Sequence, residues 1–290
     1  MHIPVLSEEI RSLLAPLAPE IQGPSFSFMD GTFGRGGHTD IFLQYFPYAK
    51  IWAFDRDPEA MIWGKTQHRY KNLYWVGDCF SRFEHYIPGK ISGIVLDLGV
   101  SSPQLDQPER GFSFRYSGPL DMRMSQSGLS AKDLIKNASE KELSHIFWTY
   151  GQERRAHYLA RVIKNHKGSL ETTTDLAQLL CHALGIRHKT FSLHPATRVF
   201  QALRIVVNQE LEEVYKTLPR AIEALAPLGI LIVISFHSLE DGIVKRAIQA
   251  CPKEYYRYCK KPIVPSALEV KKNPRARSAK LRWVQRCETS

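Results

Sequence analysis

Glycines and carboxylates with the spacing of a nucleotide site lie near the start of the chain. Asp30–His38 reads Asp-Gly-Thr-Phe-Gly-Arg-Gly-Gly-His and follows the short apolar run Ser25–Phe28. A glycine-rich turn between a strand and a helix lets a ligand approach the backbone, and the free N–H groups of the helix start point at that ligand. Asp55 ends the next apolar run, Ile51–Phe54, where a carboxylate can accept hydrogen bonds from ribose hydroxyls. The pattern predicts a Rossmann-like site for a cofactor that contains adenosine.

The glycine spacing distinguishes between such cofactors. Glycines stand at positions 31, 34, 36 and 37, and Thr39 occupies the place of the third glycine in a dinucleotide G-x-G-x-x-G motif. A nicotinamide oxidoreductase therefore fits poorly. An acidic residue followed by G-x-x-G-x-G-G resembles instead the first motif of S-adenosylmethionine-dependent methyltransferases. The alternative without a ligand is a tight turn in an ordinary α/β sheet.

Two further polar clusters follow apolar runs. Asp97 comes directly after Ile91–Leu96, and His237 follows Leu228–Phe236. Ligands bind at the carboxyl edge of open α/β sheets, so Asp97 is the first candidate for a proton acceptor and His237 the second. The structural alternatives are that Asp97 caps the turn after it and that His237 is a hydrogen-bonded strand-end residue. Ser238 is the expected cap of the next helix.

A loop at residues 110–124 contains three aromatic residues and three arginines. It is either a wall of the substrate pocket, with aromatic faces for a base and arginines for phosphate, or a satellite core anchored by Phe112 and Phe114. His194–Arg198 precedes a helical pattern and could touch the substrate or cap that helix.

A parallel sheet is needed to bring these residues together. Strand-like segments are expected at Ser25–Phe28, Ile51–Phe54, Leu73–Val76, Ile91–Leu96 and Ile230–Phe236, with helical patterns between the early ones. From about Leu105 to Val199 the pattern is helical instead, at Ala131–Asn137, Glu140–Thr149, Arg154–Asn165 and Thr174–Leu184. The predicted fold is α/β, a Rossmann-like class I methyltransferase sheet with an inserted helical subdomain.

Domain boundaries follow from this break in the pattern. Residues 1–104 and 200–290 are expected to form the S-adenosylmethionine-binding methyltransferase domain, and residues 105–199 an inserted helical subdomain for substrate recognition. One long helix is expected from Thr197 to Leu225. Lys260–Val264 and Ala279–Gln285 are the expected antiparallel pair that closes the sheet.

Composition favours a cytoplasmic globular protein. The 290 residues are 43% hydrophobic and 23% charged, and no apolar run approaches the roughly 20 residues of a membrane helix. The N-terminal residues lack a cleavable signal pattern. The five cysteines form no C-x-x-C pair, so neither a zinc knuckle nor a disulfide framework is expected, and no metal ligand is predicted.

Net charge points to a polyanionic partner. The formal charge is +10, and cations crowd the C-terminal tail, with aromatic residues between them. Cations neutralise phosphates while aromatic faces stack on unpaired bases, so this mixture suits single-stranded nucleic acid. The tail residues are Lys260, Lys261, Lys271, Lys272, Arg275, Arg277, Lys280 and Arg282, with Tyr255, Tyr256, Tyr258 and Trp283.

Taken in order and spacing, the motifs closely resemble the bacterial small-subunit (16S) ribosomal RNA cytosine-N4 methyltransferase family, also called MraW. The resemblance runs from Pro4 to about Arg282. It rests on Asp30–His38, Asp55–Pro58, Leu96–Asp106, Glu109–Met124, His194–Arg198, Ile234–Asp241 and Asn273–Arg282. Departures from the family pattern are Ser117 and Ser125 in place of Asp, Leu228 in place of Gly, and Gly242 in place of Arg.

The resemblance implies a function and a set of site residues. The implied reaction is S-adenosylmethionine-dependent methylation of N4 of a cytidine in the decoding region of 16S rRNA, within the small ribosomal subunit. Phe80 follows the third strand, where an adenine ring could stack. The implied cofactor contacts are Gly36, Gly37, His38, Asp55, Phe80, Asp97 and Gln104.

Other functions stay open at the level of sequence. The same chemistry on another RNA position or on DNA is the nearest alternative. A non-catalytic RNA-binding factor would keep the basic tail, but Gly36, Gly37, Asp55 and Asp97 together argue against it. A homodimer is a candidate assembly, and no membrane partner is expected.

Overall fold

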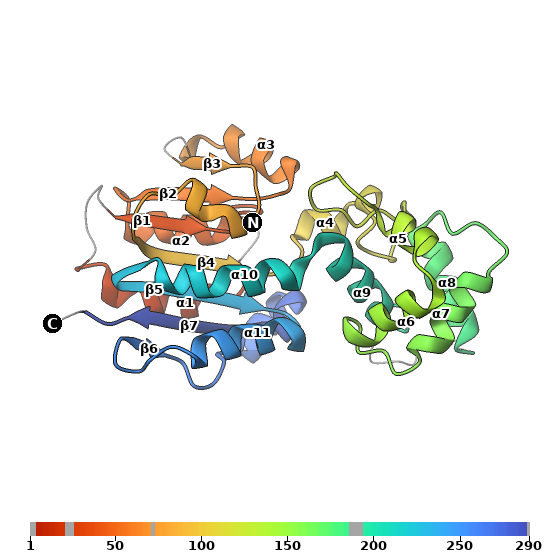
Figure 1. Ribbon diagram of the computed structural model, residues 1–290. Helices are drawn as coiled ribbons and strands as arrows, with labels where there is room; N and C mark the ends of the chain where they lie inside the picture. Colours follow the sequence, from red (N-terminus) through yellow and green to blue (C-terminus); the bar gives the residue numbers. More distant parts are fainter. Residues whose placement is uncertain (1–3, 21–25, 71–72, 186–193, 289–290) are drawn as a thin grey trace. The chain divides into compact units, whose positions relative to one another are not determined.

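The computed structural model describes residues 4–20, 26–70, 73–185 and 194–288 (Figure 1). The chain forms two compact units, residues 1–99 with 211–290 and residues 100–210. It therefore leaves the first unit once and returns to it once. The sequence placed these two boundaries after residues 104 and 199.

The first unit is built on one mixed sheet. Among the described residues, seven strands lie in the order β3-β2-β1-β4-β5-β7-β6. The strands from β1 to β5 pair in parallel, and β7 lies antiparallel between β5 and β6. Their bounds are β1 Ser27–Asp30, β2 Lys50–Phe54, β3 Tyr74–Val76, β4 Ile91–Asp97, β5 Leu225–Ser235, β6 Tyr256–Tyr258 and β7 Lys280–Arg286.

The strand order creates a switch point in this sheet. The chain runs outward from β1 through β2 to β3, and then continues with β4 on the other side of β1. Connections leave the carboxyl ends of β1 and β4 in opposite directions, which opens a crevice for ligands at that edge. All residues of β1 and all of β4 except its last are buried. The predicted α/β class and its parallel strands are confirmed.

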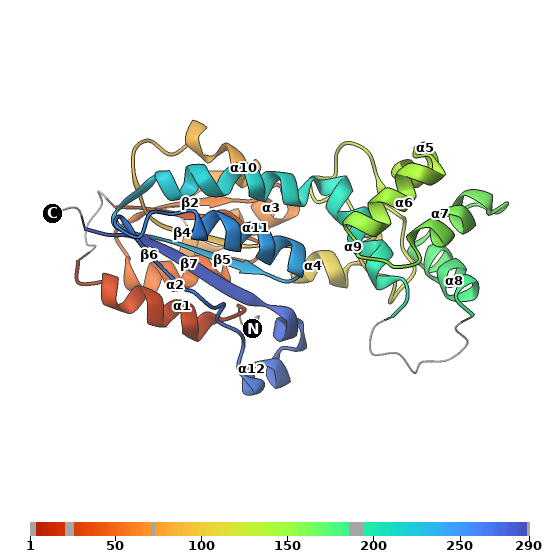
Figure 2. The same ribbon diagram turned by 60° about the horizontal axis from the view of Figure 1, so that its bottom comes forward.

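Helices cover both faces of the sheet (Figures 1 and 2). One face packs against α1 Ser7–Leu14, α2 Gly37–Tyr45 and α3 Pro58–Thr66. The other packs against α10 Glu210–Glu223 and α11 Ser238–Gln249. Burial of apolar surface on both faces explains why the strands read as near-continuous apolar runs rather than alternating ones.

The predicted long helix over Thr197–Leu225 is wrong. The chain forms α9 Thr197–Asn208 and then α10, because Gln209 adopts a left-handed conformation with φ of 52°. The Asn208 side-chain amide donates to the carbonyl oxygens of Arg204 and Met122, at 2.9 and 2.7 Å. These bonds tie the last turn of α9 to the loop at Met122, and the left-handed Gln209 that follows cannot continue a right-handed helix.

One strand of the predicted antiparallel pair near the C-terminus, Lys260–Val264, is also wrong. β7 pairs with β6, whereas Ile263, in the predicted partner, forms only an isolated bridge with Leu281. Pro262 and Pro265 flank that bridge and have no N–H group to donate to a ladder. The first predicted strand begins at Ser25, which lies outside the described residues.

The second unit is helical, as its sequence predicts. It contains α4 Ser102–Asp106, α5 Ala131–Asn137, α6 Glu140–Thr149, α7 Ala156–Asn165, α8 Thr173–Ala183 and α9. Ser130, Ser139 and Thr172 cap α5, α6 and α8 with reciprocal side-chain hydrogen bonds. The first unit also contains several short elements, among them the 3₁₀ helix η3 at Phe80–His85 and the helix α12 at Ala267–Lys272. No helix within the described ranges is long and apolar enough to cross a membrane.

Candidate cofactor site and active site

Two glycines shape the turn that follows β1. Gly36 precedes α2 with a φ of 72°, and a Cβ there would lie 2.3 Å from the Tyr70 hydroxyl. A Cβ on Gly37 would lie 2.8 Å from the Pro4 Cβ. Side chains are therefore excluded at both positions, and the first N–H groups of α2 have no acceptor within the helix. This is the arrangement that binds anionic or polar ligand groups at a helix start.

Asp30 holds the turn from beneath. Its buried carboxylate accepts hydrogen bonds from the Thr39 hydroxyl at 2.7 Å and the Thr32 N–H at 3.2 Å. Burial raises the pKa of Asp30, and the nearby His38 ring and these hydrogen bonds oppose the rise. Thr39, in the place of a dinucleotide motif's third glycine, thus has a structural role of its own.

Asp55 lies at the end of β2, facing the glycine turn. Its two carboxylate oxygens accept hydrogen bonds from the Gly34 N–H at 2.8 Å and the Asp57 N–H at 2.9 Å. Burial raises the pKa of Asp55 to about 6, against the effect of these two hydrogen bonds. Phe80 begins η3 on the other side of the turn, where its Cβ would lie 3.1 Å from a Cβ placed on Gly31.

Asp97 ends β4 with an incomplete set of hydrogen bonds. Its N–H donates to the Thr32 hydroxyl at 2.7 Å, which fixes the backbone next to the glycine turn. Carboxylate atom Oδ2 lies 3.8 Å from His38 Nδ1, whereas the buried Oδ1 has no hydrogen-bond partner in the part of the chain that the structure describes. Burial raises the pKa of Asp97 to about 6, His38 lowers it, and Asp30 and Glu240 raise it further. An acceptor atom held without a donor is suited to an N–H group of a ligand.

His237 is placed differently from Asp97. It is the N-cap of α11: its Nδ1 accepts from the Glu240 N–H at 3.4 Å, and its Nε2 lies 3.1 Å from Glu240 Oε1. The predicted cap, Ser238, is instead the first helical residue. His237 is therefore a hydrogen-bonded residue at the end of a strand, as the structural alternative predicted. Its catalytic role stays a prediction.

Gln104 belongs to the second unit, unlike the other predicted cofactor contacts. It is buried in α4 and its side-chain oxygen accepts from the Ser101 N–H at 3.0 Å. The structure brings the other predicted contacts to the carboxyl edge of the sheet in the first unit, at Gly36, Gly37, His38, Asp55, Phe80 and Asp97.

The aromatic and arginine-rich loop is largely a satellite core of the second unit. Phe112 is buried and Phe114 packs against the same cluster. Arg110 is buried, and one of its terminal nitrogens donates to two backbone carbonyls. Of the aromatic residues and arginines of this loop, Arg115 and Tyr116 are exposed and can therefore meet a substrate.

His194 also has a structural contact. Its Nδ1 accepts from the Ala196 N–H at 3.2 Å, just before α9, and its ring stacks on Phe114 with centroids 4.5 Å apart. The N-cap of α9 is Ala196 and no side chain caps this helix, so the capping alternative is not realised, and a substrate contact of this segment stays a prediction.

Some residues of the site carry no signal in the sequence. Thr32 fixes the backbone of Asp97, Glu240 lies near its carboxylate, and the Val5 carbonyl contacts the His38 ring at 3.1 Å. A hydroxyl in a turn and a carboxylate in a helix are too common to single out. A backbone carbonyl is present at every position.

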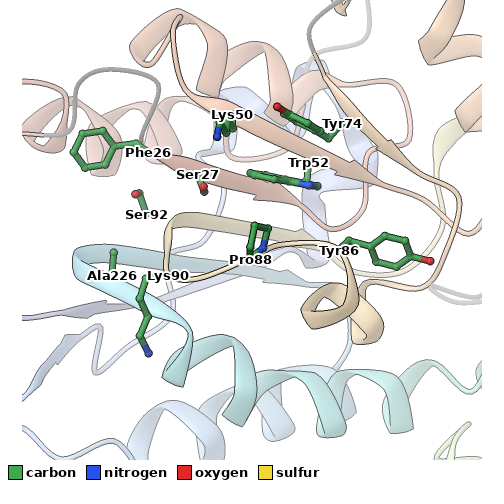
Figure 3. A pocket seen from close by; sticks show the side chains of 10 residues that line it. All are labelled: Phe26, Ser27, Lys50, Trp52, Tyr74, Tyr86, Pro88, Lys90, Ser92 and Ala226. Atoms are coloured by element: carbon green, nitrogen blue, oxygen red, sulfur yellow. The ribbon is translucent and has the colours of Figure 1, made fainter.

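A surface pocket of about 670 Å³ lies at the opposite edge of the same sheet (Figure 3). It is lined by residues at the starts of the parallel strands, including Ser27, Lys50 and Ser92. Trp52 stacks on Tyr74 there, with ring centroids 4.6 Å apart. The pocket is therefore separate from the cluster around Asp97.

The basic tail divides into two sets of residues. Arg282 is buried and donates to Asp241 of α11 at 2.7 Å, and Lys280 lies 3.2 Å from the same carboxylate. These two cations hold β7 to α11. The exposed cations of the tail are Lys260, Lys261, Lys271, Lys272, Arg275 and Arg277. The exposed cations in and after α12 come just before Lys280 in the chain. Lys280 pairs with Ser235 at the carboxyl edge of the sheet, which is the edge that carries Asp97.

The strand order with an antiparallel β7, the glycine turn after β1 and the carboxylates that end β2 and β4 define a class I S-adenosylmethionine-dependent methyltransferase. Within that class the chain belongs to the MraW methylase family, whose model matches residues 1–287.

Curated relatives agree over nearly the whole chain. A ribosomal RNA small subunit methyltransferase H from Rhodopseudomonas palustris is 42% identical over 311 residues, covering 99% of this chain and 91% of that protein. The protein of that name from Cyanothece sp. is 45% identical over 303 residues, covering 99% and 95%. Among solved structures, a putative methyltransferase from Streptococcus mutans in complex with SAH aligns with a TM-score of 0.49 at 12% identity, covering 98% and 99% of the two chains, a likeness too low to add to the family assignment.

Proposed function

We propose that this protein methylates N4 of a cytidine in the decoding region of 16S rRNA, acting on the small ribosomal subunit in the cytoplasm. The choice of small-subunit rRNA as substrate rests on the names of the relatives. The choice of cytidine and of its N4 atom rests on the motif resemblance described above. The observation that carries the proposal is Asp97, a half-buried carboxylate at the end of β4 whose buried atom Oδ1 has no hydrogen-bond partner in the described residues.

The residues at this edge fit S-adenosylmethionine. A Cβ on Gly36 would collide with Tyr70 and one on Gly37 with Pro4, so the turn needs glycine at both positions, and the helix start behind them presents N–H groups. We assign to Asp55 the hydrogen bonds from the ribose hydroxyls and to Phe80 the contact with the adenine ring. When bound, the cofactor supplies an electrophilic methyl group on a sulfonium sulfur.

The residues of the protein must make the exocyclic amine of cytosine a better nucleophile. The lone pair of an exocyclic cytosine amine is delocalised into the ring, so the amine is a weak nucleophile. A carboxylate that accepts a hydrogen bond from this N–H restores lone-pair character as the new bond forms, and it takes the proton afterwards. Asp97 Oδ1 is the acceptor that we assign to this role. His237, held at the start of α11, is the second candidate.

The exposed cations at the same edge provide the RNA surface. Lys271, Lys272, Arg275 and Arg277 lie in and after α12, next to the start of β7. Phosphate neutralisation by such side chains gives affinity without reading the sequence. The target base must leave any stack, which costs about a few kcal/mol, and these contacts offset that cost.

The direct test is methyl transfer from labelled S-adenosylmethionine to undermethylated small subunits and to naked rRNA, with the label located by nucleoside mass spectrometry. We expect label in N4-methylcytidine of the subunit. Label in another nucleoside, or only in DNA offered in parallel, would replace the substrate assignment with the alternative that the sequence left open.

Asp97→Asn tests the acceptor. We expect single-turnover methyl transfer to fall by about 10²-fold or more, because the amide cannot accept the proton. The affinity for S-adenosylmethionine, measured by calorimetry, separates lost chemistry from lost cofactor binding. Glu84→Gln is the matched control, since Glu84 is an exposed carboxylate that pairs with Arg220. Full activity of Asp97→Asn would remove Asp97 from the mechanism.

A further inference from the structure

His38 is held between a backbone carbonyl and a carboxylate. Its side chain is buried, its Nε2 lies 3.1 Å from the Val5 carbonyl oxygen, and its Nδ1 lies 3.8 Å from Asp97 Oδ2. A carbonyl oxygen can only accept a hydrogen bond, so Nε2 must carry a proton and donate it to Val5. The Val5 contact therefore selects the tautomer of the ring.

The selected tautomer determines what faces Asp97. In the neutral ring with a proton on Nε2, Nδ1 has a bare lone pair directed toward a carboxylate oxygen. His38 Nδ1 and Asp97 Oδ2 are then both hydrogen-bond acceptors, so they repel each other. The contact becomes favourable when one of the two atoms carries a proton. A proton on Nδ1 makes His38 a cation beside the carboxylate form of Asp97.

The other charges near Asp97 have the opposite effect. Asp30 at the end of β1 and Glu240 in α11 are both buried, and both raise the pKa of Asp97, as burial does. His38 alone among these groups lowers it. The Val5–Leu6 segment that supports His38 is fixed in turn, because the Leu6 N–H donates to Glu269 of α12 at 2.7 Å.

We propose that His38 is a positioning residue for proton transfer, which keeps Asp97 in the carboxylate form until the substrate amine delivers its proton. This inference rests on the proposed role of Asp97. As the N–C bond forms and the methyl–sulfur bond breaks, the bonding electrons stay on sulfur and one N–H proton passes to Asp97 Oδ1. Oδ1 itself is buried, so this proton leaves through the exposed part of the same carboxyl group, whose side chain is 26% exposed.

The test is a carboxyl titration followed by ¹³C NMR on the full-length protein, without cofactor or RNA, in the wild type and in His38→Gln. The glutamine amide can still donate to Val5 but carries no charge. We expect the titration midpoint of Asp97 to rise by about one pH unit, and Asp97→Asn identifies its signal. The acid limb of the single-turnover pH profile should move by the same amount, with activity recovering at high pH.

His157→Gln is the matched control, because it makes the same change at an exposed histidine of the second unit that pairs with Glu140, and it should leave the Asp97 midpoint in place. An unchanged midpoint in folded His38→Gln overturns the proposal. If that variant does not fold, His38→Asn, which is smaller than the ring it replaces and also uncharged, takes its place with the same expected rise of the Asp97 midpoint, and an unchanged midpoint overturns the proposal. Neither titration uses RNA, so the result for His38 does not depend on whether N4-methylcytidine is found in the methyl-transfer experiment.

Discussion

At the scale of single residues, one departure from the family pattern falls at a position with a strained backbone conformation. Leu228 lies in β5 where the family usually has glycine, and its φ is 62°. The left-handed conformation costs a residue with a Cβ about 1–2 kcal/mol. This chain therefore carries local strain at a position remote from Asp97, at the amino end of the same sheet.

Leu228→Gly should relieve that strain. We expect the free energy of unfolding to rise by about 0.5 kcal/mol, since glycine's larger loss of backbone freedom and the missing side chain offset part of the gain. Urea unfolding followed by circular dichroism measures the change. Leu228→Ala is the control, because it removes the side chain but keeps a Cβ, and should lower stability. Equal losses in both variants would contradict the explanation.

At the scale of elements, the C-terminal strand is joined to a helix by a buried ion pair. Asp241 of α11 accepts from Arg282 of β7, and both side chains are buried. Burial by itself raises the pKa of Asp241, but the hydrogen bonds from Arg282 and Lys280 outweigh it, so the pKa is below its usual value. The folded-state pKa is depressed, so this contribution to stability is present above pH 3.8 and is lost as the pH falls through the folded-state pKa.

Asp241→Asn should therefore destabilise the first unit at neutral pH. We expect a loss of about 3–5 kcal/mol, because Arg282 would stay buried without its charge partner. Chemical unfolding at pH 7 and at about pH 3 measures it, and the difference from the wild type should shrink at the lower pH. Arg277→Gln, a change at an exposed arginine of the tail, should alter stability by no more than about 0.5 kcal/mol at either pH. A pH-independent difference would count against the ion pair.

At the scale of the whole molecule, the cations of the C-terminal tail fall into two sets, one held in structural ion pairs and one exposed to solvent. The exposed ones near α12 lie at the edge of the sheet that carries Asp97, whereas Lys253 and Arg257 lie near the opposite end of β7. Charge placed at one edge of the first unit would orient RNA toward the proposed active site.

Replacing Lys271 and Lys272 together by alanine should weaken RNA binding and its salt dependence. Each lost phosphate contact on single-stranded RNA lowers the slope of log affinity against log salt by about 0.7. Filter binding to naked rRNA at several salt concentrations measures both quantities. The matched control replaces Lys253 and Arg257, also exposed, and should change the slope less. Equal effects would show that net charge matters and position does not.

The sequence by itself determined the α/β class, the parallel strands, the helical insertion and the cofactor class. These follow from local patterns: apolar runs, the glycine spacing, and polar residues placed directly after strands. It also predicted Asp97, because a carboxylate at the end of a buried strand has few structural reasons to be there.

Only the tertiary structure decided which polar residues are engaged and which are left free. It assigned Arg110, Lys280 and Arg282 to structural contacts, divided the long helix at Gln209, and moved the pairing of β7 to β6. It also placed the Val5 carbonyl against His38. Each of these outcomes depends on groups distant in sequence that compete for one donor, acceptor or strand edge, and no local pattern records that competition.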